Sequence, residues 1–157
     1  LALRGVPGIY FHSLFGSRNW RAGVAATGRY RTINREKLTL DRLNRELETE
    51  GGLRRLVFAG YRRLLAARTS HPAFHPMAAQ EIVPVQEAVL AIRRGGGNGR
   101  RPLLCLHNVS RQPQTIHFKA PSNRVKDLIT DEAFAGQQKQ FTMTMGPYQA
   151  MWLAETD

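Results

Sequence analysis

Residues 5–13, GVPGIYFHS, decide the fold expected for this chain. Gly5 and the Pro7-Gly8 pair interrupt any preceding helix. The continuous apolar run at residues 9–11 then predicts a short strand buried on both faces, as in a parallel sheet. Residues 13–37 follow as a long loop rich in glycine, arginine and asparagine. Long loops in compact domains are uncommon, and those that occur often carry function.

Two helices are predicted after the loop. Thr39 is of a residue type that caps helix N-termini, and Asp41 lies in the first turn, where the helix dipole favours a carboxylate. The Gly51-Gly52 pair ends this helix. The second helix starts at Leu53 with apolar residues at three- and four-residue steps, and His71-Pro72 stops it because the residue before proline avoids helical angles.

From Glu81 onward the pattern changes to short alternating strands separated by turn residues, chiefly the glycine-rich residues 95–99 and Gly146-Pro147. This predicts an antiparallel β-sandwich. The boundary is placed near Pro84, which gives residues 1–83 and 84–157 as two domains of an α+β chain. The expected strands are 88–93, 103–109, 115–119, 125–129, 140–145 and 148–154.

Composition narrows the class of protein. The 157 residues include 23 lysines and arginines against 12 acids, a net charge of +11. Such a charge allows a basic module that binds nucleic acid or glycan, but no recognition helix, zinc finger or aromatic RNA-binding strand accompanies it. We therefore interpret the positive charge as a basic surface exposed to solvent. The single cysteine, Cys105, suits a buried structural thiol and a reducing, cytoplasmic compartment. No signal peptide or membrane span is expected.

Candidate chemistry is sparse. His12 ends the predicted strand, a position where barrel enzymes place working residues. Retaining glycoside chemistry needs two carboxylates about 5–5.5 Å apart, and no convincing pair is found. No metal site, phosphate loop or dinucleotide motif is recognised, so neither a metal nor another cofactor is expected.

A family resemblance rests on residues 5–13, 16–19, 27–29 and 31–37, with Ile33-Asn34-Arg35 as its most specific part. Together they resemble the sucrose-phosphorylase-like branch of the alpha-amylase family. The resemblance implies that residues 1–83 are the last strand, active-site loop and helices of a (β/α)8 barrel, followed by a small antiparallel C-terminal domain. It also implies that Arg35 binds the glucosyl unit, with Arg31 and Asn34 as second choices. His12 is a further substrate-binding candidate because of its place at the end of the predicted strand.

The resemblance implies the C-terminal part of a retaining α-glucosyl phosphorylase, acting on sucrose or a related glucoside through a glucosyl-enzyme. The family's catalytic carboxylates lie on earlier strands, so no catalytic residue is assigned here and the chain alone is expected to be inactive. Its expected partners are a sugar substrate, inorganic phosphate and the missing N-terminal barrel, with neither nucleic acid nor membrane. A hydrolase or transglycosidase of the same family is the alternative.

Overall fold

The computed structural model describes residues 1–96 and 101–156. The chain divides into two compact units, one made of Leu1–Val6 with Ala66–Asp157 and the other of Pro7–Leu65. Helices and antiparallel strands occupy separate stretches of sequence, which confirms the α+β class. Within the described ranges, no helix is both long and apolar enough to span a membrane.

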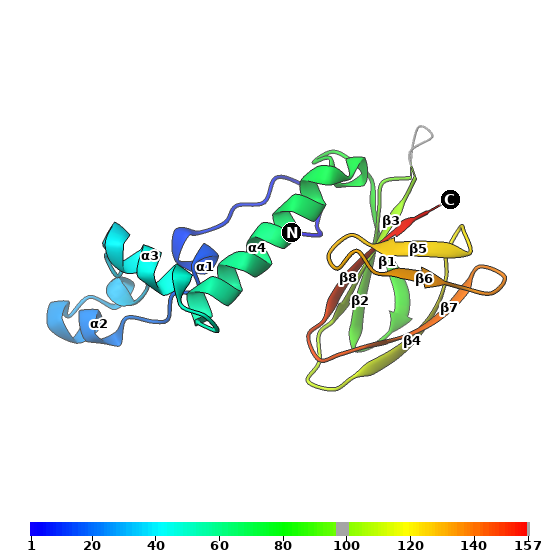
Figure 1. The fold of residues 1–157 in the computed structure, drawn as a ribbon. Helices are drawn as coiled ribbons and strands as arrows, with labels where there is room; N and C mark the ends of the chain where they lie inside the picture. Colours follow the sequence, from blue (N-terminus) through cyan, green and yellow to red (C-terminus); the bar gives the residue numbers. More distant parts are fainter. Residues whose placement is uncertain (97–100, 157) are drawn as a thin grey trace. The chain divides into compact units, whose positions relative to one another are not determined.

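The first unit is an antiparallel β-sandwich (Figure 1). A six-stranded sheet has the order β1-β2-β3-β8-β5-β6, and β4 pairs with β7 in a second sheet. The bounds are β1 (Gln80–Gln86), β2 (Val89–Arg94), β3 (Leu103–Asn108), β4 (Gln114–Lys119), β5 (Arg124–Asp127), β6 (Ala133–Ala135), β7 (Gln140–Met145) and β8 (Ala150–Glu155).

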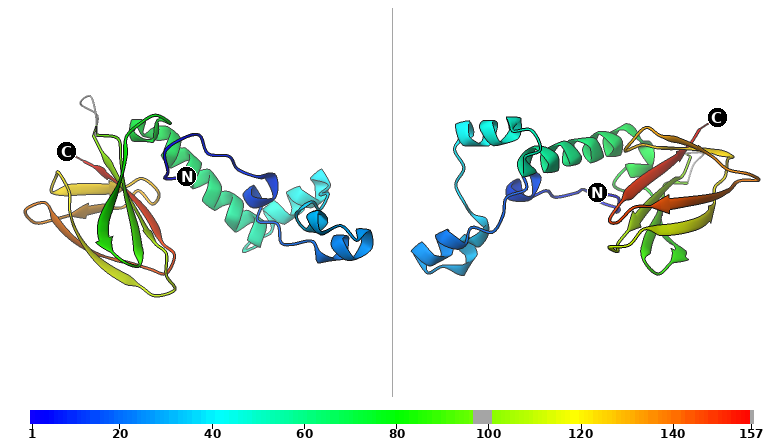
Figure 2. Two further views of the ribbon diagram at one scale, coloured as in Figure 1. Left: turned by 180° about the vertical axis from the view of Figure 1, so that it is seen from behind. Right: turned by 60° about the horizontal axis from the view of Figure 1, so that its bottom comes forward.

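The core of the sandwich lies between the two sheets, as the two views of Figure 2 show. Leu106 from the large sheet and Ile116 and Met145 from the small one are almost fully buried there. Phe118 and Phe141 stack with ring centroids 5.2 Å apart. Alternation along β7 produces this burial, because every second residue points inward.

The other face of the large sheet is also apolar. It presents Ile92, Cys105 and Trp152, and the short helix η2 (Pro72–Phe74) packs on it. The rings of Phe74 and Trp152 are 4.7 Å apart between centroids. The large sheet is therefore buried on both faces.

Two buried arginines lie on this second face. Arg94 is fully buried and donates to the carbonyls of Ala73 and His75 at 3.4 and 3.2 Å and to Oε1 of Gln80 at 3.3 Å. Arg68 donates to backbone carbonyls of the segment Leu1–Val6 and lies over the Phe74 ring. Neither guanidinium has a carboxylate partner within the described residues, so its hydrogen bonds go to neutral carbonyl oxygens.

Burial raises the pKa of the Cys105 thiol to about 12. We expect the folded chain to resist alkylation by iodoacetamide at about pH 8, because the thiolate is the nucleophile. Unfolding in urea should restore ordinary reactivity. Since the folded pKa is raised, the unfolded chain loses its proton first as the pH rises, and stability should fall above about pH 9. Mass-spectrometric labelling with and without urea measures the reactivity of the Cys105 thiol, and rapid labelling of the folded chain contradicts the expected protection.

The six expected strands are present as β2, β3, β4, β5, β7 and β8, although their ends shift by up to two residues. Strands β1 and β6 were not predicted. Both are edge strands, and β1 tolerates Pro84 because an edge strand leaves one row of amides unpaired. The expected boundary near Pro84 falls inside β1, and the predicted glycine turn extends into residues 97–100, outside the described ranges.

The second unit is helical. It contains α1 (Phe11–Leu14), α2 (Arg21–Thr27), η1 (Tyr30–Asn34), α3 (Leu40–Glu48) and the first part of α4 (Leu53–Ser70). The predicted cap of α3 is present, because the Thr39 hydroxyl accepts from the amide of Arg42 at 3.3 Å. Gly51 takes a positive φ of 68° between the two long helices, and α4 ends before Pro72 as expected.

The strand expected at residues 9–11 does not form. Residues 6–10 have no regular structure and α1 begins at Phe11. A parallel strand takes its hydrogen bonds from neighbouring strands, and none pairs with this segment in the described chain. Local bonds form instead: the Leu14 amide donates to the Tyr10 carbonyl at 3.0 Å. His12 therefore lies on a helix, not at a strand end. The expected loop also contains α2 and η1.

Candidate functional site

Three of the four predicted binding residues lie together on η1 and its end. Arg31 and Asn34 belong to the 3-10 helix, and Arg35 is its C-terminal cap. All three residues are exposed. The carbonyl of Ile33 accepts from the Trp20 amide at 2.6 Å, which ties η1 to the segment before α2. The local fold thus fixes the backbone while the cationic side chains remain available to a ligand.

A hydrogen bond joins this segment to the one that carries His12. The Tyr10 hydroxyl donates to the Asn34 carbonyl at 3.0 Å. The Tyr10 and His12 rings are 5.5 Å apart between centroids. Tyr10 therefore contacts both His12 and the carbonyl of Asn34, although the structure places His12 on α1 rather than on a strand.

Arg35 has no ion pair within the described part of the chain. The nearest acid in sequence, Glu36, accepts instead from Nη1 of Arg42 at 2.8 Å. An alternative structural role for Arg35, pairing with Glu36, is therefore not seen. An exposed guanidinium without a partner can form bidentate bonds to a carboxylate, a phosphate or neighbouring sugar hydroxyls.

His12 is held by a chain of polar contacts that the sequence did not reveal. Its Nδ1 lies 2.9 Å from Oγ of Ser17. That oxygen accepts from Nη1 of Arg54 at 2.8 Å, and the same nitrogen donates to the Phe15 carbonyl at 3.0 Å. Arg54 also pairs with Glu46. Arg54 and Ser17 are 37 residues apart, so no local pattern could have indicated this contact.

Two acids of the helical unit, Glu36 and Glu46, form structural ion pairs. Glu46 accepts from both Arg42 and Arg54, and these hydrogen bonds, that from Arg42 first, hold its pKa below the usual range. A general acid in glycoside cleavage needs a raised pKa. Glu46 is therefore unsuited to that role. In the described residues no cluster of three or more histidines, cysteines and acids could hold a metal ion.

Gly16 fixes the turn that presents Ser17. Its φ is 59°, and an added Cβ would lie 2.8 Å from Cγ2 of Val57. We expect Gly16→Ala to destabilise the chain by about 1–3 kcal/mol, because a left-handed backbone and a close contact both oppose a side chain there. Urea unfolding measures the effect.

Gly60→Ala is the matched control for that variant. Gly60 lies within α4, and a Cβ there would meet nothing within 4 Å. Alanine should stabilise this position by about 0.5–1 kcal/mol, because glycine is a poor helix former. Equal effects of the two substitutions contradict the role assigned to Gly16.

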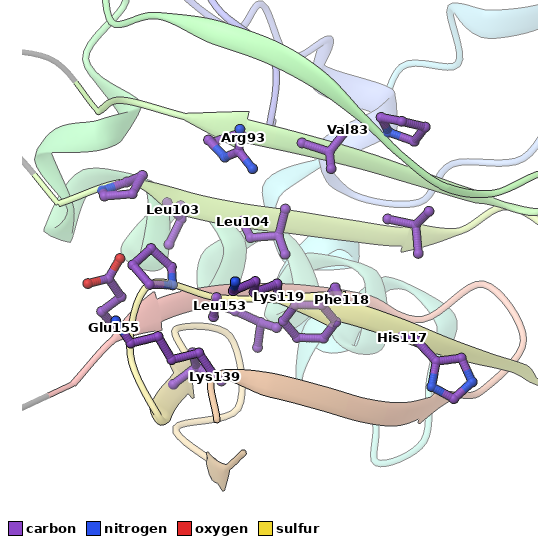
Figure 3. A pocket seen from close by; sticks show the side chains of 16 residues that line it. Val83, Arg93, Leu103, Leu104, His117, Phe118, Lys119, Lys139, Leu153 and Glu155 are labelled. Atoms are coloured by element: carbon purple, nitrogen blue, oxygen red, sulfur yellow. The ribbon is translucent and has the colours of Figure 1, made fainter. Parts of the chain in front are cut away.

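A separate cavity of about 640 Å³ lies within the β-sandwich (Figure 3). Leu104 and Phe118 from the two sheets line it, and Lys139 and Glu155 lie near one end. Oε1 of Glu155 is buried and has no hydrogen-bond partner among the described residues. None of the predicted binding residues lines this cavity.

Comparison with curated proteins gives relatives along almost the whole chain. The glucosylglycerate phosphorylase of Spirochaeta thermophila is 39% identical over 98% of this chain and 28% of its own length. The enzyme of the same name from Allomeiothermus silvanus is 38% identical over 99% of this chain and 25% of its own length. That from Escherichia coli is 37% identical over 98% and 26%. The chain therefore spans about a quarter of the length of the curated relatives it matches.

Solved structures give the same fold. An alpha-amylase from H. orenii matches 83% of this chain and 25% of its own with a TM-score of 0.55 at 20% identity. AmyP in complex with maltose matches 67% and 22% with a TM-score of 0.57 at 16% identity. No family model matches the chain.

Along almost its whole length the chain is similar in sequence to these phosphorylases, and its fold matches part of alpha-amylase structures. The matched phosphorylases are of the sucrose-phosphorylase-like kind within the alpha-amylase family. The predicted resemblance is confirmed.

Proposed function

We propose that this chain is the C-terminal part of a retaining glycoside phosphorylase that transfers a glucosyl unit from glucosylglycerate to inorganic phosphate. The observation that carries the proposal is the 37–39% identity to three glucosylglycerate phosphorylases over at least 98% of the chain. In the whole enzyme an aspartate attacks the anomeric carbon, glyceric acid leaves, and phosphate resolves the glucosyl-enzyme.

In this proposal the present chain binds and orients the substrate. Arg35 holds the glucosyl unit, and its lack of an ion pair within the described residues supports the assignment. Arg31 and Asn34 line the same exposed segment, and His12 donates a hydrogen bond to a sugar hydroxyl or a phosphate oxygen. The basic charge of the segment suits two anionic reactants, because a guanidinium binds carboxylate and phosphate oxygens.

The domain assignment is part of the same proposal. The boundary expected near Pro84 is moved ahead of β1, which belongs to the sandwich. The residues before β1 close a barrel and the sandwich forms the C-terminal domain, in a cytoplasmic enzyme. The carboxylates that cleave the bond lie in the preceding sequence, and the chain alone turns over no substrate.

The test uses the full-length enzyme with phosphate and either glucosylglycerate or sucrose, and follows release of glucose 1-phosphate. We expect glucosylglycerate to be the preferred donor. Glucose release with no phosphate requirement favours a hydrolase instead, and a sucrose preference overturns the acceptor assignment. The 157-residue chain is assayed in parallel, and turnover by it contradicts its role as a non-catalytic part.

A further inference from the structure

The side chains of Glu46, Arg54 and Ser17 lead in order to Nδ1 of His12, and all four residues belong to the helical unit. Glu46 comes from α3, Arg54 from α4, and the other two from the segment of α1 and the turn after it. We call this set the histidine relay.

The direction of each hydrogen bond follows from the donor inventory. A guanidinium only donates, so Oγ of Ser17 is the acceptor of the 2.8 Å bond from Arg54. The hydroxyl proton of Ser17 is then free to point elsewhere. Nδ1 of His12, at 2.9 Å, is the other polar atom bonded to this oxygen in the described residues.

The charge of Arg54 favours a hydrogen bond that the Ser17 hydroxyl donates to Nδ1 of His12. A cation donating to a hydroxyl oxygen polarises its O–H bond, which makes the hydroxyl a better donor to the next acceptor. The reverse arrangement, with Nδ1–H donating to Ser17, would aim two donors at one oxygen and leave the hydroxyl proton without a partner in the described chain. The contacts therefore favour Nδ1 as the acceptor.

We propose that the histidine relay holds neutral His12 in the tautomer with its proton on Nε2, so that Nε2–H is the donor that meets the substrate. Ser17 and Arg54 are positioning residues, because they act on the ligand only through His12. The tautomer assignment stands on the contacts alone, whereas the role toward substrate rests on the proposed function.

Glu46 completes the relay by fixing Arg54. It accepts from Arg54 and, through its other oxygen, from Nε of Arg42 at 2.8 Å. The Arg54 side chain is only 11% exposed, so a carboxylate partner offsets much of the cost of burying its charge. The guanidinium is thereby held where it reaches both Ser17 and the Phe15 carbonyl.

The chain contains its own reference for the expected tautomer. Nδ1 of His71 accepts from the amide of Ala73, and Nδ1 of His75 accepts from that of Met77, each at 3.2 Å. A backbone N–H can only donate. Nδ1 is therefore the acceptor in both rings, and each ring carries its proton on Nε2 when it is neutral. Their nitrogen shifts calibrate the spectrum of the same sample.

The experiment is long-range proton–nitrogen correlation NMR of the 157-residue chain with nitrogen-15 histidine, at about pH 8.5, where an ordinary imidazole is neutral. We expect the Nδ1 and Nε2 shifts of His12 to match the pattern of His71 and His75. Ser17→Ala should return His12 to a mixture of tautomers, and Ser17→Thr, which keeps the hydroxyl, should preserve the single form. Unchanged backbone amide signals of α3 and of the first part of α4 establish that the helical unit of each variant is folded, since His71 and His75 lie in the other unit.

A His12 ring with its proton on Nδ1 overturns the proposal, and so does a Ser17→Ala spectrum identical to that of the parent chain. If Ser17→Ala does not fold, Arg54→Lys gives the same test, because it shortens the donor but keeps its charge.

In the full-length enzyme, Ser17→Ala should lower kcat/KM about tenfold, the loss expected for one hydrogen bond, and Ser17→Thr should restore it. Unchanged kcat/KM overturns the role toward substrate while the tautomer result stands. An unmodified enzyme with no phosphorylase activity overturns the proposed function and leaves the NMR result intact.

Discussion

Arg35→Ala in the full-length enzyme is expected to lower kcat/KM for phosphorolysis roughly 10- to 100-fold. A hydrogen bond from a charged group contributes about 1.5–3 kcal/mol, and each 1.36 kcal/mol is tenfold in rate. Arg35 is exposed at the end of η1, and Glu36 beside it accepts from Arg42. The guanidinium is thus free to serve the substrate without first breaking an ion pair.

Two further variants show whether the loss in Arg35→Ala comes from the guanidinium itself or from the lost positive charge. Arg35→Lys keeps the charge but loses the planar fork, and should give an intermediate rate. Arg45→Ala removes another exposed cation, from α3, a helix that holds none of the proposed binding residues, and should change kcat/KM less than twofold. Equal losses in Arg35→Ala and Arg45→Ala would show that only overall charge matters.

Arg94→Ala should lower the free energy of unfolding by about 2–4 kcal/mol. The change leaves acceptors of Ala73, His75 and Gln80 without their donor and opens a cavity beside a tightly packed face, and each effect is known to cost at least 1 kcal/mol. Removal of a buried charge acts in the opposite direction. We expect the first two effects to dominate, because three acceptors of Arg94 lose their donor together.

The neighbouring residue is the control. Arg93 lies on the same strand but points to the opposite face, is exposed, and pairs with Glu81 at 2.7 Å. Arg93→Ala should change stability by about 0.5 kcal/mol or less. Arg94→Met, which restores volume without charge, should lie between the two in urea unfolding. If Arg94→Met is more stable than the parent chain, the buried charge is a net cost.

Local sequence signals predicted the long helices and most strands because their causes are local. Thr39 caps α3 through its own side chain, Gly51 supplies the positive φ between the helices, and Pro72 stops α4. The alternation in β7 matches its burial residue by residue. Edge strand β1 was missed because Pro84 and the polar residues around it weaken the pattern that a central strand must have.

The remaining features depend on contacts that no short pattern contains. The run at residues 9–11 is as apolar as a parallel strand, yet no neighbouring strand pairs with it in the described chain, and α1 begins within it. The candidate site was predicted in part: Arg31, Asn34 and Arg35 came from the family resemblance. Ser17, Arg54 and Glu46 were not predicted, because their meeting with His12 requires helices far apart in sequence to pack first.

The hydrogen bonds from Arg68 to the first residues of the chain affect how far segment 7–65 can vary in length. Because the carbonyls of Leu1, Leu3 and Gly5 bind Arg68, the β-rich unit holds both ends of the intervening segment 7–65. That segment is topologically an insertion. Doubling the length of such an insertion adds only about 0.6 kcal/mol of closure entropy. A change in the length of segment 7–65 should therefore cost the β-rich unit little stability.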